Sequence, residues 1–160
     1  MTAFSLRRAT AADADVLARH RADMFRDMGE LSDDVRDTLV AAARAYFAAA
    51  IPDGRYIAWL AEAGGEIVGG AGLQLRELLP RPARGGARLV RGPQGLILNV
   101  FTERAWRRRG VAAALMRELL SWCGENGIES VVLHASPEGR PLYDKLGFTP
   151  TNEMQYARDG

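Results

Sequence analysis

The residues best suited to chemistry form a short run at positions 107–112, between an apolar segment and an amphipathic one. Three arginines precede a glycine at the point where the apolar residues take up helical spacing. The first turn of a helix offers free backbone N–H groups and the positive end of the helix dipole, which bind phosphate oxygens. A glycine lets a ligand approach the backbone, and arginines add charge-assisted contacts. The run therefore predicts a pyrophosphate site formed by Arg107, Arg108, Arg109, Gly110, Val111 and Ala112.

The sequence around this run is strongly basic. Residues 81–109 contain eight arginines and one acid, Glu103, which indicates an anionic ligand. Arginine is also the general basic residue of this chain, whose only lysine is Lys145, so a solvated arginine-rich loop is the alternative. Aromatic residues do not alternate with the arginines and no helix-turn-helix pattern is present. A compact anion is therefore expected here, and nucleic acid is not.

Other site types lack their signatures. The run is not followed by Gly-Lys-Ser/Thr, as a P-loop would be, and it lacks the Gly-x-Gly-x-x-Gly spacing of dinucleotide sites. The Gly-x-Ser-x-Gly motif of a serine nucleophile is also absent. Cys123 is the only cysteine, so no internal disulfide and no multi-cysteine metal site is expected. It lies in an apolar helix pattern and is interpreted as a core residue.

The composition is that of a globular protein. Hydrophobic residues make up 48% and charged residues 26% of 160 residues, which predicts a single domain over residues 1–160. No run of about 18 apolar residues occurs, so no membrane span is expected. The first residues lack the apolar stretch of a secretory signal. These features favour a cytoplasmic protein.

Hydrophobic periodicity and turn residues predict a mixed α/β sheet flanked by about four helices. The expected helices are 10–28, 32–50, 111–122 and 138–146. The expected strands are 4–8, 55–62, 66–75, 95–101 and 130–135, with one or two further strands over 148–157, interrupted at Pro150. Proline and glycine residues mark 77–94 as a long loop, and loops of this length are typically functional or mobile.

Three segments resemble the GNAT acetyltransferase family. Arg107-x-x-Gly110-x-Ala112 matches the family element (Gln/Arg)-x-x-Gly-x-(Gly/Ala), which holds the pyrophosphate of acetyl-CoA. Residues 96–102, Leu-Ile-Leu-Asn-Val-Phe-Thr, are similar to the family's fourth strand. Residues 142–148, Leu-Tyr-Asp-Lys-Leu-Gly-Phe, match the signature Leu-Tyr-x-Lys-x-Gly-Phe. The order of elements agrees too, so the resemblance covers nearly the whole chain.

The resemblance implies an acetyl-CoA-dependent N-acetyltransferase without a metal, in which the fourth and fifth strands splay apart. The pantetheine arm would pair with backbone at Val100, Phe101 and Thr102. The N–H of Val100 or Phe101 would polarise the thioester carbonyl. Tyr143 would donate a proton to the departing thiolate, the alternative being a core tyrosine.

The resemblance implies cofactor contacts less directly for two further residues. Ser136 stands where many relatives have a cofactor-contacting asparagine, and its hydroxyl can form a similar hydrogen bond. Arg140 either reaches a phosphate or lies on the surface.

The sequence leaves several candidates for the general base that deprotonates the amine. The glutamate that serves histone-modifying relatives falls near Leu96, which cannot take a proton. His134, at the end of the fifth strand, has a suitable side chain, although a structural histidine is equally common there. Glu103, Glu30 and a water chain are the other candidates.

The acceptor pocket is expected between the first two helices and the 77–94 loop, with the end of the first helix lining it. Methionine and phenylalanine at helical spacing are often core residues, which is the alternative. The candidate acceptor contacts are Met24, Phe25, Met28, Glu30 and Asn99.

The predicted function is acetyl transfer to the amine of a small molecule. The alternatives are transfer to a protein or peptide and a non-catalytic acyl-CoA sensor. A homodimer is compatible with the family.

Overall fold

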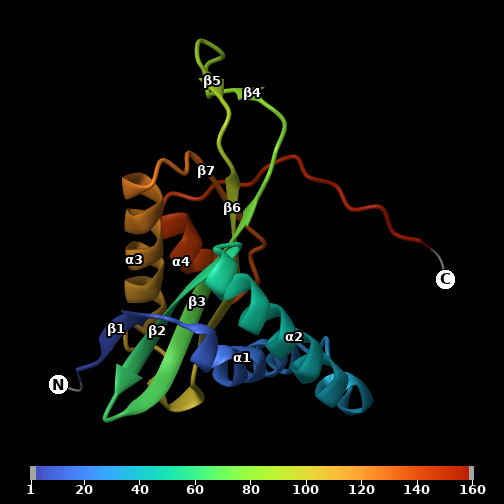
Figure 1. Ribbon diagram of the computed structural model, residues 1–160, viewed down its shortest axis with the longest axis vertical. Helices are drawn as coiled ribbons and strands as arrows, with labels where there is room; N and C mark the ends of the chain where they lie inside the picture. The colour runs from blue at the N-terminus through green and yellow to red at the C-terminus, as the bar shows by residue number, and fades with distance from the viewer. Residues whose placement is uncertain (1–2, 159–160) are drawn as a thin grey trace.

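The computed structural model describes residues 3–158, which form one five-stranded sheet with helices on both faces (Figure 1). Helices α1 and α2 cover one face, and α3 and α4 cover the other. The helices are α1 Ala14–Asp27, α2 Asp33–Asp53, α3 Val111–Glu125 and α4 Arg140–Lys145, with 3₁₀ turns at Ala11–Asp13 and Arg104–Trp106. The sheet strands are β1 Ser5–Arg8, β2 Tyr56–Ala63, β3 Glu66–Arg76, β6 Gln94–Thr102 and β7 Ser130–Leu133.

The sheet opens between its last two strands. The strand order is β1-β2-β3-β6-β7, with antiparallel pairs up to β6 and a parallel β6–β7 pair. That pairing runs from Gln94 with Ser130 to Ile97 with Leu133, and β6 then continues to Thr102. The mixed sheet and the separation of the fourth and fifth long strands are both confirmed.

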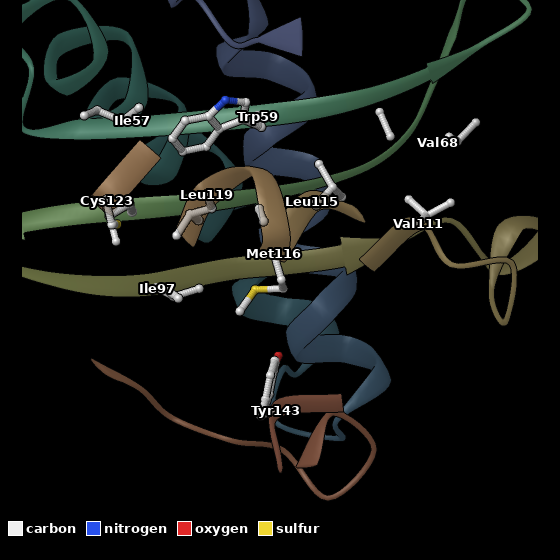
Figure 2. Close-up of a cluster of buried hydrophobic side chains, with 13 residues drawn as sticks. Ile57, Trp59, Val68, Ile97, Val111, Leu115, Met116, Leu119, Cys123 and Tyr143 are labelled. Carbon is white, nitrogen blue, oxygen red and sulfur yellow. The ribbon is translucent and has the colours of Figure 1, made fainter. Parts of the chain in front are cut away.

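One hydrophobic cluster lies between α3 and the sheet (Figure 2). Leu115, Met116 and Leu119 are fully buried against strand residues that include Trp59. Each large side chain buried in this way contributes about 1.5–3 kcal/mol. Cys123 is 2% exposed in the same cluster, so its interpretation as a core residue is confirmed.

A second cluster joins α1 and α2 to the opposite face of the sheet. It contains Leu17, Phe47 and Tyr56, all nearly inaccessible. Thr10 and Asp13 form a capping box that starts the first helical segment, as their spacing predicts. Gly54 ends α2 in the left-handed conformation, with φ of 81°. The two long N-terminal helices are thereby held at fixed positions over β2, β3 and β6.

Two segments differ from the sequence prediction. The 77–94 loop contains a small antiparallel pair, β4 Arg81–Pro82 with β5 Leu89–Val90, and projects beyond the sheet (Figure 1). The expected strands within 148–157 do not form, and residues 149–158 are exposed where the structure describes them. A strand needs a neighbouring edge for its backbone hydrogen bonds, and this segment is not paired with its own sheet.

Candidate active site

The start of α3 has the form expected of an anion site. Gly110 adopts φ of 82° as the N-terminal cap residue, and the Ala114 N–H donates to the Gly110 carbonyl at 3.0 Å. The N–H groups of Val111, Ala112 and Ala113 precede this first helical bond and point out of the helix. A side chain atom added to Gly110 would meet nothing within 4 Å, so space is open beside these donors. Positive φ strongly favours glycine at this position.

The three arginines before this helix have different surroundings. The Arg107 guanidinium donates to the Thr102 carbonyl at 3.0 Å and to Asp27 at 2.6 Å. Arg107 therefore braces the ends of β6 and α1 through two of its guanidinium nitrogens, and its predicted contact with a phosphate stays a prediction. Arg108 is exposed, with φ of 63°, and the Arg109 guanidinium lies 5.1 Å from the Trp106 ring centre. The latter two supply the available charge at the tip of α3.

A bulge interrupts β6 just before the gap. Gly72 pairs with Leu98 and Gly70 with Phe101, so two residues of β6, Asn99 and Val100, lie opposite the single residue between those glycines. Asn99 adopts φ of 60°. Bulges of this kind bend a strand and redirect its neighbouring groups. The turn in β6 therefore sets the direction of the backbone that enters the gap.

Asn99 also holds this bulge to α1. Its Nδ2 donates to the Leu17 carbonyl at 3.1 Å, and the residue is 3% exposed. The sequence prediction placed Asn99 among acceptor contacts, whereas the structure places its side chain against the helix backbone. The sequence missed this role because it depends on a contact between residues 82 positions apart.

The gap exposes backbone where the resemblance predicts it. Val100, Phe101 and Thr102 lie beyond the last β6–β7 pair, Ile97 with Leu133. The Phe101 side chain is 7% exposed and points away into the protein, against His20 at a ring distance of 4.9 Å. The side of β6 that faces the gap thus presents main-chain groups to an extended ligand, as an unpaired edge does.

His134 and Tyr143 line one cavity of about 1270 Å³, together with Arg140. Tyr143 comes from α4 and points its hydroxyl toward the side of α3 and the sheet (Figure 2). Burial raises the pKa of Tyr143, so its phenol keeps its proton at neutral pH. His134 is exposed directly after β7. A phenol and an imidazole therefore share this cavity.

Ser136 lies in the turn before α4. Its Oγ accepts a hydrogen bond from the Gly139 N–H at 3.2 Å, so the hydroxyl shapes the chain that leads to Tyr143. Arg140 is exposed, and its Nε lies 3.7 Å from the Asp144 carboxylate. Neither observation assigns a cofactor contact to these two residues.

The predicted acceptor residues gather at the C-terminal end of α1. Met24 and Phe25 are half-buried, while Met28 and Glu30 are exposed. The two core clusters are built from other residues, so these side chains are available at the surface. The Glu30 N–H donates to the Phe25 carbonyl at 2.9 Å and folds the chain over the helix end.

A buried polar cluster behind β6 was not identified from the sequence. His20 is fully buried, and its Nε2 lies 3.5 Å from Glu103 Oε1. Burial, with a smaller contribution from Arg19, lowers the pKa of His20 to about 4, so the ring is neutral at physiological pH. The sequence places His20 on the apolar stripe of the first helix, which gives no indication of a partner after β6.

Asp23 is the second centre of this cluster. Its carboxylate accepts hydrogen bonds from Arg19, Arg26 and Arg36 at 3.3, 3.1 and 2.9 Å. Arg19 also lies 2.9 Å from Glu103. The cluster therefore connects α1 and α2 with the end of β6, beside the chain that leads to the tip of α3.

Comparisons with known proteins agree with this arrangement. The family model for the acetyltransferase (GNAT) family matches residues 19–148. A GCN5-related N-acetyltransferase from Ralstonia eutropha superposes with a TM-score of 0.87 and 32% identity, covering 99% of this chain and 100% of that one. A predicted acetyltransferase from Clostridium acetobutylicum, solved with acetyl-CoA, superposes with a TM-score of 0.81 and 26% identity. The superposition covers 98% of this chain and 96% of that one.

A relative from Trypanosoma brucei brucei, a glucosamine 6-phosphate N-acetyltransferase, is 33% identical over 95 residues. The match covers 59% of this chain and 58% of the length of that relative.

The fold is that of the N-acetyltransferases with which the chain superposes. The chain belongs to the acetyltransferase (GNAT) family.

The residues fit the co-substrate of that family. Outward N–H groups and two arginines at the α3 tip suit a diphosphate, and the unpaired β6 edge suits the pantetheine arm. Among residues 3–158, no group of three His, Cys, Asp or Glu side chains is placed to hold a metal ion. In the same part of the chain, no helix has the length and apolar character needed to cross a membrane.

Proposed function

We propose that the protein transfers an acetyl group from acetyl-CoA directly to the primary amine of a small molecule, within a ternary complex. The observation that carries this proposal is that the unpaired end of β6 leads directly, through residues 103–110, to the open tip of α3. The ligand path that we propose runs from this tip along the edge of β6 toward Tyr143 on α4. A thioester bound along this path supplies an activated acetyl carbonyl to an amine at its far end.

Donor binding depends on the first two parts of the path. The N–H groups of Val111 and Ala112 bind the diphosphate, with Arg108 and Arg109 neutralising its charge. Arg107 fixes the position of this loop through Asp27 and the end of β6. Ser136 and Arg140 extend the contacts from the opposite side of the gap.

The residues after the β6 bulge orient the acetyl group. An N–H of Val100 or Phe101 donates to the thioester oxygen and stabilises the negative charge that develops there. Asn99 supports this role indirectly, because its hydrogen bond to α1 maintains the bulge. The preorganised backbone donor requires no rearrangement during the reaction.

The proton transfers use the two cavity residues. The amine reaches the acetyl carbon as a neutral group after giving a proton to His134. The new C–N bond forms as the C–S bond breaks, and the Tyr143 hydroxyl donates its proton to the departing thiolate. The raised pKa of Tyr143 keeps that proton available until this step. The nitrogen then loses its second proton to the Tyr143 phenolate, and His134 releases the first proton to solvent.

The end of α1 forms the acceptor side. Met24, Phe25 and Met28 offer apolar contact, and the Glu30 carboxylate attracts an ammonium group before it loses its proton. The substrate named for the Trypanosoma relative is a small molecule with an amine, which supports this class of acceptor.

The test is a thiol-release assay with acetyl-CoA and a panel of small amines, peptides and intact proteins. The proposal predicts release with at least one small amine and formation of its N-acetyl product by mass spectrometry. Turnover only with peptides or proteins would instead support the alternative acceptor class. Tight binding of acetyl-CoA without thiol release for any amine would support a sensor. Failure to bind acetyl-CoA would contradict all three.

A further inference from the structure

One part of the sheet face that carries α1 and α2 lies outside their hydrophobic cluster. Leu73, Ile97 and Leu133 belong to the cluster under α3, so their neighbours along β3, β6 and β7 point to the opposite face. On that face, α1 contacts the C-terminal half of β6 at Asn99 and Phe101, and the cluster under α2 is built on β2. The N-terminal half of β6 has no share in that cluster.

Two rows of cross-strand neighbours form this part of the face, and we call them the floor. The row nearer the gap between β6 and β7 contains two apolar residues, Leu96 and Val132, which belong to neither hydrophobic cluster. The outer row is entirely polar. The rows are Gln74–Leu96–Val132 and Arg76–Gln94–Ser130, and all of these residues except Leu96 are half-buried.

Hydrogen bonds hold the Arg76 guanidinium in place on the floor. Its Nε donates to Gln94 Oε1 at 2.7 Å, and its Nη2 donates to the same oxygen. Gln94 Nε2 in turn donates to Ser130 Oγ at 2.9 Å. The three strands thus contribute one member each to a connected chain. The Arg76 Nη1 forms no hydrogen bond with any residue in 3–158, so it is available to a ligand.

The charge of Arg76 has no counter-ion in the protein. Among residues 3–158, no acidic side chain forms an ion pair with it. The acid that precedes Ser130 is Glu129, and its carboxylate is bound by Arg88 at 2.9 Å. A half-buried cation loses part of its hydration, and an anion compensates for that loss. The floor therefore favours a negatively charged group.

A second arginine lies at the same end of β6. The Arg81 Nη1 donates to the Gly92 carbonyl at 3.0 Å, two residues before Gln94. Its Nη2 is buried and has no hydrogen-bond partner in the part of the chain that the structure describes. Arg81 thus adds to the positive charge beside the Arg76 row.

The floor begins where the gap between β6 and β7 closes. The last pair before the gap is Ile97 with Leu133, and Leu96 with Val132 is the next pair inward. His134, the proposed base, follows Val132 by two positions. The α3 cluster fills the other face of the sheet, so an acceptor must approach a thioester in the gap from the side of the floor.

We propose that the acceptor amine also carries an oxyanion, a carboxylate or a phosphate, which Arg76 binds above the floor. This assignment of the acceptor class rests on the proposed acetyl transfer. Gln94 orients the guanidinium, and the Ser130 hydroxyl can donate to the same anion. Leu98 at the gap and Gln94 are four strand residues apart, about 13 Å. The amine and the oxyanion must therefore be separated by several bonds, unlike those of an α-amino acid.

Matched acceptors test the charge and the spacing. The anionic series runs from β-alanine to ε-aminocaproate, with aminoalkyl phosphates of the same lengths, and the neutral series is the corresponding amino alcohols. We expect kcat/KM to be about tenfold or more higher for the best anionic amine than for its neutral counterpart, with a preference that grows with chain length. The better of the two anionic series identifies the oxyanion. Equal values for every pair would overturn the inference and leave the proposed acetyl transfer intact.

Two glutamine variants assign the preference to one arginine. Arg76→Gln should reduce the preference for anionic amines about tenfold or more, with kcat/KM for the amino alcohols and KM for acetyl-CoA unchanged. Arg84→Gln removes an exposed charge from the same loop and should retain the preference. If Arg76→Gln lowers kcat/KM equally for both series, the arginine has only a structural role and the inference fails.

Binding without turnover separates this inference from the proposed function. Each anionic amine and its amino alcohol would be titrated by calorimetry into the protein saturated with CoA. We expect tighter binding of the anionic amine and loss of the difference in Arg76→Gln. Such binding without acetylation of any amine would support the oxyanion site and contradict acetyl transfer. If no anionic amine shows binding that depends on Arg76, the inference is overturned whatever the turnover.

Discussion

The tip of α3 and the cavity beside α4 are built in different ways, although the proposed function requires one ligand to reach both. At the tip, the donors are main-chain N–H groups and arginines within a few consecutive residues. In the cavity, His134 follows β7 and Tyr143 lies on α4. The first arrangement depends on local conformation, whereas the second depends on packing. Acceptor specificity can therefore change while donor binding is retained.

Replacement of the cavity phenol should have the largest effect. Tyr143→Phe removes the proton for the thiolate, so we expect kcat to fall about 10²- to 10⁴-fold, with little change in KM for acetyl-CoA. Tyr46→Phe, which removes a phenol on α2, is the matched control and should retain activity. Steady-state thiol release measures both. Equal kcat for Tyr143→Phe and the unmodified protein would remove Tyr143 from the mechanism.

The buried cluster behind β6 should make stability depend on pH. The His20 pKa of about 4 in the folded state lies below its unfolded value, so the unfolded chain binds the proton first as pH falls. Stability should therefore decrease from pH 6.5 toward pH 4, by up to about 3 kcal/mol from this residue. Urea unfolding at several pH values measures the slope.

Two histidine variants separate the contribution of His20 to the pH dependence of stability from that of other groups. His20→Gln should reduce the slope, whereas His134→Gln, which alters an exposed ring, should leave it unchanged. An identical slope in the unmodified protein and the His20→Gln variant would show that other groups control acid stability.

At the α3 tip, removal of charge should weaken donor binding and leave the chemical step intact. For the Arg108→Ala, Arg109→Ala double variant we expect KM for acetyl-CoA to rise about tenfold or more, roughly 1.4 kcal/mol, with kcat retained. The difference should diminish at high salt. Arg117→Ala, an exposed arginine further along α3, is the control. An unchanged KM would place the phosphates elsewhere.

The bulge between the two regions should give the smallest effect. Asn99→Ala loses the hydrogen bond to Leu17 and must keep a left-handed conformation, whereas Asn99→Gly loses only the hydrogen bond. We expect the alanine variant to be less stable than the glycine variant by about 1 kcal/mol. Denaturant unfolding checks the order, and a reversed order would mean that the backbone relaxes at this position.

The sequence predicts the local features well. The helix that starts at Val111, the strand of β6 and the capping box at Thr10 each depend on neighbouring residues, and each forms at the expected place. The open tip of α3 follows from the same local signals. For this reason the position of the phosphate site could be proposed before the fold was known.

Contacts between residues far apart in the chain could not be predicted from the sequence. Arg107 lies in the predicted loop, but its bond to Asp27 depends on how α1 approaches β6. His20 and Glu103 are separated by about half of the chain and meet only after the sheet forms. The strands expected within 148–157 do not form, because an alternating pattern does not supply the neighbouring edge that a strand needs.

A crystal structure of the protein with acetyl-CoA tests the central claim most directly. We predict diphosphate oxygens within about 3 Å of the N–H groups of Val111 and Ala112. The pantetheine amides should hydrogen-bond to the β6 backbone between the bulge and Thr102. A thioester bound elsewhere, with the tip of α3 contacting only solvent, would contradict both the donor site and the path that leads from it.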